Sequence, residues 1–290
     1  MELGKLGVFL FTDRMPATEV AEFAQRLESL GYAALWIPEA LGRESFSHAS
    51  FLLASTERLV VATGIASIYA RDAVAAAQGQ RTLAEQSGGR FLLGLGVSHS
   101  PMVEGLRGHA YGKPVATMRA YLERMAQAPY IGIAPDEAPP TVLAALGPRM
   151  LKLAGEQANG AHPYLVPPEH TAQAREILGK GPWLCTEQKV LLETTPTRAR
   201  ELAKAAVAMY LGLPNYRNNL IRLGYTEAEL DEPADRVIDA IVAWGDEKAI
   251  AERIQAHRDA GADHVCIQPL NPSGEPKPDL RILEALAPGS

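Results

Sequence analysis

Short apolar runs alternate with amphipathic stretches along the whole chain, and this rhythm constrains the fold more than any other feature of the sequence. The runs are mostly apolar from end to end, which is typical of parallel strands that helices cover on both faces. The stretches between them have the spacing of surface helices. Strands are predicted over residues 6–11, 33–37, 59–65, 90–97, 141–146, 160–166, 189–193 and 264–268.

Start and stop signals indicate where the helices between these runs begin and end. Prolines open several of the helices, Asp72 is a predicted N-cap, and Gly31 follows a predicted helix end. The predicted helices cover about 16–30, 45–56, 72–87, 114–128, 148–157, 168–178, 196–210 and 246–260.

Eight strand–helix units within 290 residues predict an α/β protein that folds as a closed (β/α)8 barrel, or TIM barrel. No stretch resembles a flexible linker, so we expect a single domain over residues 1–290. The segment at about 212–244 exceeds what the barrel needs and is predicted to be an insertion before the last strand. An open doubly wound sheet is the alternative.

The charge balance argues against several classes of partner. The chain has 28 Lys and Arg against 34 Asp and Glu, which gives a net charge of −6. Nucleic acids and anionic membranes bind basic surfaces, so neither partner is expected. No long apolar span or secretory leader is evident, and we expect a cytoplasmic protein. Cys185 and Cys266 form no CxxC pair and are predicted to be buried thiols.

Several catalytic motifs are absent from the sequence. It contains no HxH after the first strand, no HExxH and no GxSxG, so a metal site and a serine nucleophile are not expected. The Gly94-Leu95-Gly96 pair lacks the third glycine of a dinucleotide-binding loop. Lys189 is expected to open its strand rather than close it, which disfavours a Schiff-base lysine.

Active sites of such barrels lie at the C-terminal ends of the strands. The predicted strand ends bring together an acid, Glu39, a histidine, His99, and a stretch of small residues around Ser67. A mouth with apolar walls and few charges suits a flat aromatic cofactor and a small-molecule substrate more than a metal ion.

Four blocks of the sequence carry a resemblance to a known family. Residues 61–99 read VATGIASIYARDAVAAAQGQRTLAEQSGGRFLLGLGVSH, and residues 28–40, 153–170 and 242–268 also fit. In this order they resemble the bacterial luciferase-like flavin and deazaflavin oxidoreductases, and most closely the branch that depends on coenzyme F420. The resemblance implies a (β/α)8 barrel, usually a homodimer, with the cofactor's tricyclic ring at the strand C-termini.

The resemblance also implies roles for individual residues. Relatives have a non-prolyl cis peptide behind the ring, which maps to Gly64–Ile65. Glu39 matches an acidic position that contacts the ring's polar edge or donates a proton, although Ala40 replaces the histidine that often follows it. His99 matches a position active in proton transfer. The remaining residues implied for cofactor binding are Ala66, Ser67, Gly96, Ser98, and the Asn159-Gly160-Ala161 turn with His162, near the cofactor's phosphate-bearing tail.

The predicted function is hydride transfer between C5 of the deazaflavin F420 and a small organic substrate, with His99 and Glu39 as the catalytic residues. One alternative keeps the fold and uses FMN in a monooxygenase reaction with O₂. The other is a barrel that binds a flavin-like ligand without turnover.

Overall fold

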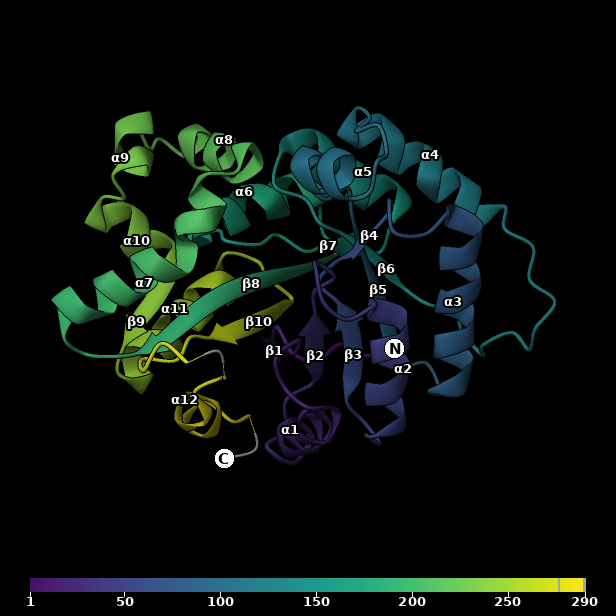
Figure 1. The fold of residues 1–290 in the computed structure, drawn as a ribbon, viewed down its shortest axis with the longest axis horizontal. Coiled ribbons are helices and arrows are strands. Elements are labelled where there is room, and N and C mark those ends of the chain that lie inside the picture. Colours follow the sequence, from purple (N-terminus) through teal and green to yellow (C-terminus); the bar gives the residue numbers. More distant parts are fainter. Residues whose placement is uncertain (276, 289–290) are drawn as a thin grey trace.

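In the computed structural model, which describes residues 1–275 and 277–288, parallel strands pair into a closed ring (Figure 1). β10 pairs with β8 on one side and β1 on the other, so that Cys266 lies between Glu187 and Gly7. This closure confirms the (β/α)8 barrel and excludes an open doubly wound sheet. The ring consists of β1 (Leu6–Phe9), β2 (Ala34–Ile37), β3 (Val60–Thr63), β5 (Phe91–Gly96), β6 (Thr141–Leu143), β7 (Gly160–Ala161), β8 (Trp183–Leu192) and β10 (His264–Pro269).

Helices follow the strands and cover the outside of the barrel (Figure 1). Asp72 caps one of them as predicted, because its carboxylate accepts hydrogen bonds from the backbone N–H groups of Val74 and Ala75. Within the described residues, no helix is long and apolar enough to cross a membrane. The helices around the barrel are α1 (Ala17–Ser29), α2 (Ser45–Ala54), α3 (Ala73–Gln86), α4 (Pro114–Ala126), α5 (Pro148–Gln157), α6 (Pro168–Leu178), α7 (Pro196–Leu211) and α11 (Glu247–Asp259).

The third predicted strand is interrupted. β3 ends at Thr63, a cis peptide joins Gly64 to Ile65, and the short strand β4 (Ala66–Ser67) then continues beside β5. A one-turn π-helix, η1 (Pro101–Leu106), follows β5. These two irregularities lie on neighbouring strands at the C-terminal end of the barrel.

β8 differs most from its prediction. The predicted strand began at Lys189, but β8 begins at Trp183, and Lys189 is the seventh of its ten residues. The polar residues Glu187, Gln188 and Lys189 do not form an apolar run, which is why the first part of the strand was missed. All three are buried. The statement that Lys189 opens its strand is therefore wrong.

The inserted segment packs as a helical layer over α7 (green, upper left in Figure 1). It comprises α8 (Pro214–Arg222), α9 (Glu227–Asp231) and α10 (Asp235–Ile241), followed by β9 (Val242–Gly245), which pairs with β8. Buried side chains such as Leu220, Val237 and Ile238 pack against Val207 of α7. The layer thus has an apolar core of its own against the barrel.

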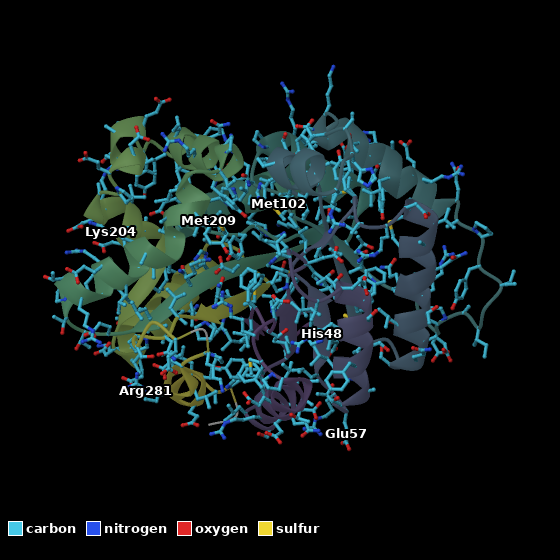
Figure 2. The ribbon with its side chains drawn as sticks, in the orientation of Figure 1. His48, Glu57, Met102, Lys204, Met209 and Arg281 are labelled. Atoms are coloured by element: carbon cyan, nitrogen blue, oxygen red, sulfur yellow. The ribbon has the colours of Figure 1, made fainter. Side chains whose placement is uncertain are left out.

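Two further features complete the fold. The C-terminal helix α12 (Leu280–Ala285) packs beside α1, where the hydroxyl of Tyr32 donates to the carbonyl of Leu283 at 2.9 Å. Cys185 and Cys266 are free buried thiols, as predicted. Side chains fill the interior, whereas charged groups such as Glu57, Lys204 and Arg281 lie at the periphery (Figure 2).

Candidate active site

The cis peptide between Gly64 and Ile65 confirms the position that the resemblance implied. The backbone around it is tied to the end of β2, because Gly64 N–H donates to the carbonyl of Ile37 at 2.8 Å. The backbone N–H of Glu39 donates to the carbonyl of Ile65 at 3.3 Å. Gly64, Ile65, Ala66 and Ser67 therefore lie together at the mouth of the barrel, as predicted.

Two glycines at this bulge leave no room for a side chain. A Cβ atom on Gly64 would lie 2.8 Å from the ring of Phe9 and 3.2 Å from Nε2 of His162. A Cβ atom on Gly96, the last residue of β5, would collide with the side chain of Ile65. The bulge packs directly on the strands beneath and beside it, which fixes its position.

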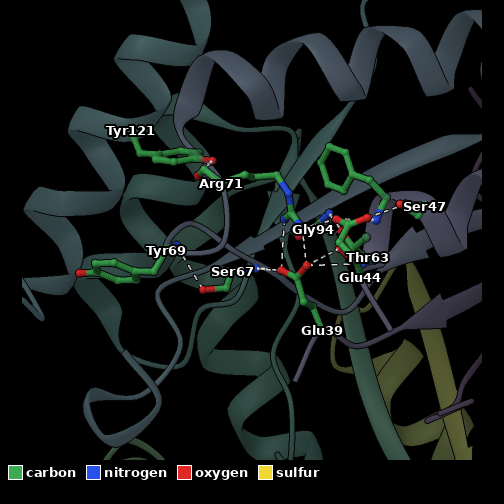
Figure 3. Close-up of polar contacts among 11 residues, drawn as sticks. Glu39, Glu44, Ser47, Thr63, Ser67, Tyr69, Arg71, Gly94 and Tyr121 are labelled. Carbon is green, nitrogen blue, oxygen red and sulfur yellow. Dashed lines mark hydrogen bonds and ion pairs between the residues drawn. The ribbon is translucent and has the colours of Figure 1, made fainter. Parts of the chain in front are cut away.

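Glu39 is held in a buried ion pair (Figure 3). Its side chain is 5% exposed and pairs with the Arg71 guanidinium, and Oε2 also accepts the backbone N–H of Ser67 at 2.8 Å. Oε1 accepts the hydroxyl of Ser45 at 3.1 Å, and Arg71 pairs in addition with Glu44. With both oxygens occupied by donors, the geometry favours a positioning role for this carboxylate over proton donation.

His99 lies between β5 and η1, partly buried at the mouth. Burial lowers the pKa of the His99 imidazole, and a hydrogen bond with the side chain of Asn215 on α8 opposes that shift. Its neighbour Ser98 has a φ of 56°, and the Ser98 carbonyl accepts the hydroxyl of Tyr111 at 3.3 Å. His99 is thus held at the mouth and neutral at physiological pH.

Opposite the bulge lies a cluster that the sequence analysis missed. Nζ of Lys189 lies 3.2 Å from Oε1 of Glu187 and 3.0 Å from Oε1 of Gln268. Tyr164 donates its hydroxyl hydrogen to the same oxygen of Gln268 at 2.8 Å, and the hydroxyl of Tyr210 lies 3.0 Å from that of Tyr164. The ammonium also lies 3.9 Å from the centroid of the Tyr164 ring.

Burial and pairing compete within this cluster. Burial lowers the pKa of the Lys189 ammonium, whereas the Glu187 carboxylate raises it. The second oxygen of Glu187 accepts the backbone N–H of Leu165 at 2.9 Å, and Leu165 has a φ of 58°. In the described residues, only Ser98 and Leu165 combine a side chain with a positive φ, and both lie at the mouth. Such backbone is typical of functional sites.

One signal in the sequence could have revealed the cluster. Glu187 and Lys189 are two residues apart, so on a strand they point to the same face. Opposite charges at that spacing, between Cys185 and Leu191, are consistent with an ion pair facing the barrel interior. The partners Tyr164, Tyr210 and Gln268 are distant in sequence and only the fold brings them together.

Ring contacts connect the two sides of the mouth. The centroid of Phe9, which packs under Gly64, lies 5.2 Å from that of Tyr164. Tyr164 lies 6.1 Å from Tyr216 of α8, and Tyr216 lies 5.9 Å from His99. The predicted residues His99 and Gly64 therefore belong to one site, which the inserted helix α8 helps to form.

The Asn159-Gly160-Ala161 turn was predicted to lie near the cofactor, but it does not reach this site. Asn159 precedes β7 and pairs through its backbone and its side chain with Thr141, the first residue of β6. It therefore lies at the N-terminal end of the strands, opposite the mouth. Gly160 and Ala161 form β7 itself. The expectation that this turn meets the cofactor's tail is corrected accordingly.

His162 lies just after β7 in the barrel interior. Its Nδ1 donates to the carbonyl of Cys185 at 2.8 Å, and its ring stacks on Trp36 at 4.4 Å. Burial lowers the pKa of His162 to about 4. Nε2 has no hydrogen-bond partner among the described residues and faces the position of the missing Cβ of Gly64. His162 thus supports the bulge from below.

Comparison with known proteins identifies the family of this chain. The model of the family described as luciferase-like monooxygenase matches residues 4–264. A relative from Mycobacterium tuberculosis, named "Putative coenzyme F420-dependent oxidoreductase Rv3520c", is 26% identical, with 92% of this chain and 96% of that protein aligned.

Two solved structures have the same fold. The coenzyme F420-dependent tetrahydromethanopterin reductase from Methanopyrus kandleri superposes with a TM-score of 0.77 at 20% identity, covering 100% of this chain and 98% of the other. The FMN complex of the oxygenating constituent of 3,6-diketocamphane monooxygenase from Pseudomonas putida gives 0.74 at 14% identity, covering 99% and 98%. On the family match over residues 4–264, the chain belongs to the luciferase-like monooxygenase family.

Proposed function

We propose that the protein is an F420-dependent oxidoreductase that transfers a hydride between C5 of the deazaflavin and a small organic substrate. The observation that carries this proposal is the bulge over residues 64–67, which packs on Phe9 at the mouth opposite a wall of aromatic rings. The relative from M. tuberculosis and the reductase with the same fold support the choice of cofactor.

The residues at the bulge fit a flat tricyclic ring. Gly64 and Gly96 let the bulge pack closely on Phe9 and Ile65, and Ala66 and Ser67 continue the strand beside them with small side chains. Gly64, Ile65, Ala66, Ser67, Gly96 and Ser98 would hold the ring, and the Glu39–Arg71 pair would fix Ser67 in place. When bound, the deazaflavin would supply a two-electron carrier that reacts at C5.

His99 is the residue placed to exchange a proton with the substrate. Burial lowers the pKa of the His99 imidazole and so favours its neutral form. A neutral imidazole can accept the proton of an alcohol and return it in the reverse reaction. Tyr216 and Asn215, both on α8, contact the imidazole ring of His99. Glu39, in contrast, acts by positioning Ser67 and Arg71.

An FMN-dependent monooxygenase is the second candidate. It is favoured by the description of the family and by the FMN-bound structure with the same fold. The two cofactors share a tricyclic ring of similar shape, so the bulge suits both. Their chemistry differs, because replacing the ring nitrogen by carbon at C5 suppresses reaction with O₂.

A titration of the purified protein with F420 and with FMN tests the choice. Trp36 lies beneath the bulge, stacked on His162, so a ring bound at the mouth should quench tryptophan fluorescence. We expect micromolar binding of F420 and weaker binding of FMN. The opposite preference would favour the monooxygenase, and binding of neither would overturn the proposed function. The homodimer stays a prediction that size-exclusion chromatography with light scattering would test.

A further inference from the structure

The amide of Gln268 has a defined orientation at the C-terminal end of β10. Its Oε1 accepts hydrogen bonds from Nζ of Lys189 at 3.0 Å and from the hydroxyl of Tyr164 at 2.8 Å. An ammonium group can only donate, so the oxygen of the amide must face Lys189. The two N–H donors of Gln268 consequently point away from this pair, and they donate to no atom in the described part of the chain. Gln268 is partly exposed, which leaves them available to a ligand.

Tyr216 supplies a second unused donor. Its ring lies in the mouth between His99, Tyr164 and Tyr210, with centroid distances of 5.9, 6.1 and 5.5 Å. Burial raises the pKa of its hydroxyl, which therefore stays protonated at neutral pH. A hydrogen bond with the side chain of Asn215 opposes this shift, so the hydroxyl oxygen accepts from Asn215, while the hydroxyl hydrogen donates to no acceptor among the residues that the structure describes. The hydroxyl of Tyr164, in contrast, is already committed to Gln268.

Both donors belong to residues that contact Tyr164. Gln268 is hydrogen-bonded to Tyr164, and the ring of Tyr216 contacts the same Tyr164 ring. They come from different elements, β10 of the barrel and α8 of the inserted segment. Tyr164 therefore lies between a donor of the barrel and a donor of the inserted segment.

The charges at the mouth indicate what kind of molecule carries this oxygen. The ammonium of Lys189 is 1% exposed and paired with Glu187, and the guanidinium of Arg71 is paired with Glu39 and Glu44. Neither cation has charge left to neutralise a carboxylate or phosphate. The remaining surface of the cluster is aromatic. This combination favours an uncharged molecule with one polar oxygen.

We propose that the Gln268 amide and the Tyr216 hydroxyl together bind the oxygen of an uncharged carbonyl substrate, or of the alcohol formed from it. This inference rests on the proposed function and deepens it by naming the substrate class. Reduction adds a hydride to the carbonyl carbon and a proton to the oxygen, which becomes a hydroxyl group. Negative charge develops on the oxygen before the proton arrives, and fixed neutral donors stabilise that charge in a site with little water. His99, in contact with Tyr216, exchanges the proton.

Acetophenone labelled with ¹³C at its carbonyl group tests the proposal on the full-length protein. Binding is measured by calorimetry, and the carbonyl stretch by infrared difference spectroscopy, with and without oxidised F420. Benzoate serves as the charged analogue. Gln268→Glu keeps an acceptor for Lys189 and Tyr164 but removes the N–H donors, and Tyr216→Phe removes only the hydroxyl. Tyr225→Phe is the matched control, because Tyr225 belongs to the inserted segment and packs on Arg236.

We expect each mouth variant to raise the Kd for acetophenone at least about fivefold, as for the loss of one hydrogen bond. The carbonyl stretch should move to higher wavenumber, and the Kd for F420 should change less than about twofold. Tyr225→Phe should change none of these values. Benzoate should bind the wild-type protein at least about tenfold more weakly than acetophenone.

Three results would overturn the proposal: no binding of acetophenone to the wild type, an unchanged Kd and stretch in Tyr216→Phe, or tighter binding of benzoate. Tyr216→Phe decides the matter if Gln268→Glu fails to fold. The two proposals fail separately. If F420 does not bind but acetophenone binds through both donors, the proposed function falls and the donor pair stands. If F420 binds and acetophenone does not, the donor pair falls and the proposed function stands.

Discussion

Replacing Lys189 with methionine should destabilise the protein strongly, because the substitution leaves Glu187 buried without its cation. The exposed fractions of the two side chains are 1% for Lys189 and 0% for Glu187, with Nζ and Oε1 3.2 Å apart. After the substitution, the carboxylate retains the backbone N–H of Leu165, 2.9 Å from Oε2, as its hydrogen-bond donor. One donor compensates little of the cost of removing a carboxylate from water.

The magnitude follows from the contacts that are lost. Breaking a buried ion pair from one side costs about 3–5 kcal/mol. The ammonium also lies 3.9 Å from the centroid of Tyr164, and a desolvated cation–π contact contributes about 2 kcal/mol. Methionine fills most of the same volume, and its sulfur regains about 1 kcal/mol against the aromatic rings. We therefore expect Lys189→Met to lower the free energy of unfolding by about 4–6 kcal/mol.

Urea unfolding at neutral pH, followed by circular dichroism, measures this loss. The control is Lys248→Met, because Lys248 and Glu252 form an exposed pair on α11 with a separation of 3.9 Å. This control should cost less than about 0.5 kcal/mol. The double variant Glu187→Gln/Lys189→Met should be about 2 kcal/mol more stable than Lys189→Met, because a neutral amide still accepts from Leu165. A double variant no more stable than the single one would refute the reasoning.

Three further predictions concern the bulge, the ion pair beside it and the buried histidines. Gly64→Ala should lower the free energy of unfolding by about 1–3 kcal/mol, because its Cβ overpacks against Phe9, and it should raise the Kd for F420. Gly181→Ala is the control, because its Cβ lies in open space, and it should change neither value in the same assays. Glu39→Gln should lower the free energy of unfolding by about 2 kcal/mol in urea and weaken F420 binding, because a neutral amide loses the ion pair with Arg71 beside Ser67. Unchanged stability with abolished turnover would instead identify Glu39 as a proton donor. Burial lowers the pKa of His162 to about 4 from an ordinary value near 6.5, so unfolding takes up a proton between these values. The contribution of His162 to stability should be fully present above pH 6.5 and fall by up to about 1.4 kcal/mol per pH unit toward pH 4. Burial also lowers the pKa values of His48, His257 and His264, so each of them adds to the slope, and a flat profile over this range would contradict the prediction.

The helices were predictable because their ends are marked by local chemistry. α5 and α6 have the bounds that were predicted, each starting at a proline that suits the first helical turn. The capped helix α3 also begins where Asp72 indicates. These signals involve residues within about one helical turn, so they predict helix ends without knowledge of the tertiary structure. The alternation of strands and helices then leaves few folds other than a closed barrel.

The cis peptide at Gly64–Ile65 was predictable only from the resemblance. A glycine within an apolar run is equally consistent with close packing of a strand, and no local rule predicts the conformation of the next peptide bond. The structure shows that Gly64 is required for another reason as well, since Phe9 and His162 occupy the space beside it. Both contacts join residues that are distant in sequence.

The wall opposite the bulge was missed because its residues break the pattern used to find strands. Charged residues in β8 look like loop residues until their partner is known, and Glu187 and Lys189 are partners of each other. The Asn159 turn was misplaced for a different reason. Its role came from the resemblance alone, whereas its position just before the strand that begins at Gly160 places it at the N-terminal end of the barrel.

The distribution of these residues suggests how binding is divided within the site. Gly64 lies between β3 and β4, and the backbone of the bulge is hydrogen-bonded to Ile37 at the end of β2. Tyr216 and Asn215 belong to the inserted segment, yet they contact His99. Because α8 rests on its own apolar core with α7, its side chains can change without disturbing the bulge. Replacing residues 214–218 with alanine, and keeping the buried Asn219, should therefore alter substrate affinity while the Kd for F420 changes less than about twofold. An equal loss of F420 binding would show that cofactor and substrate depend on the same wall.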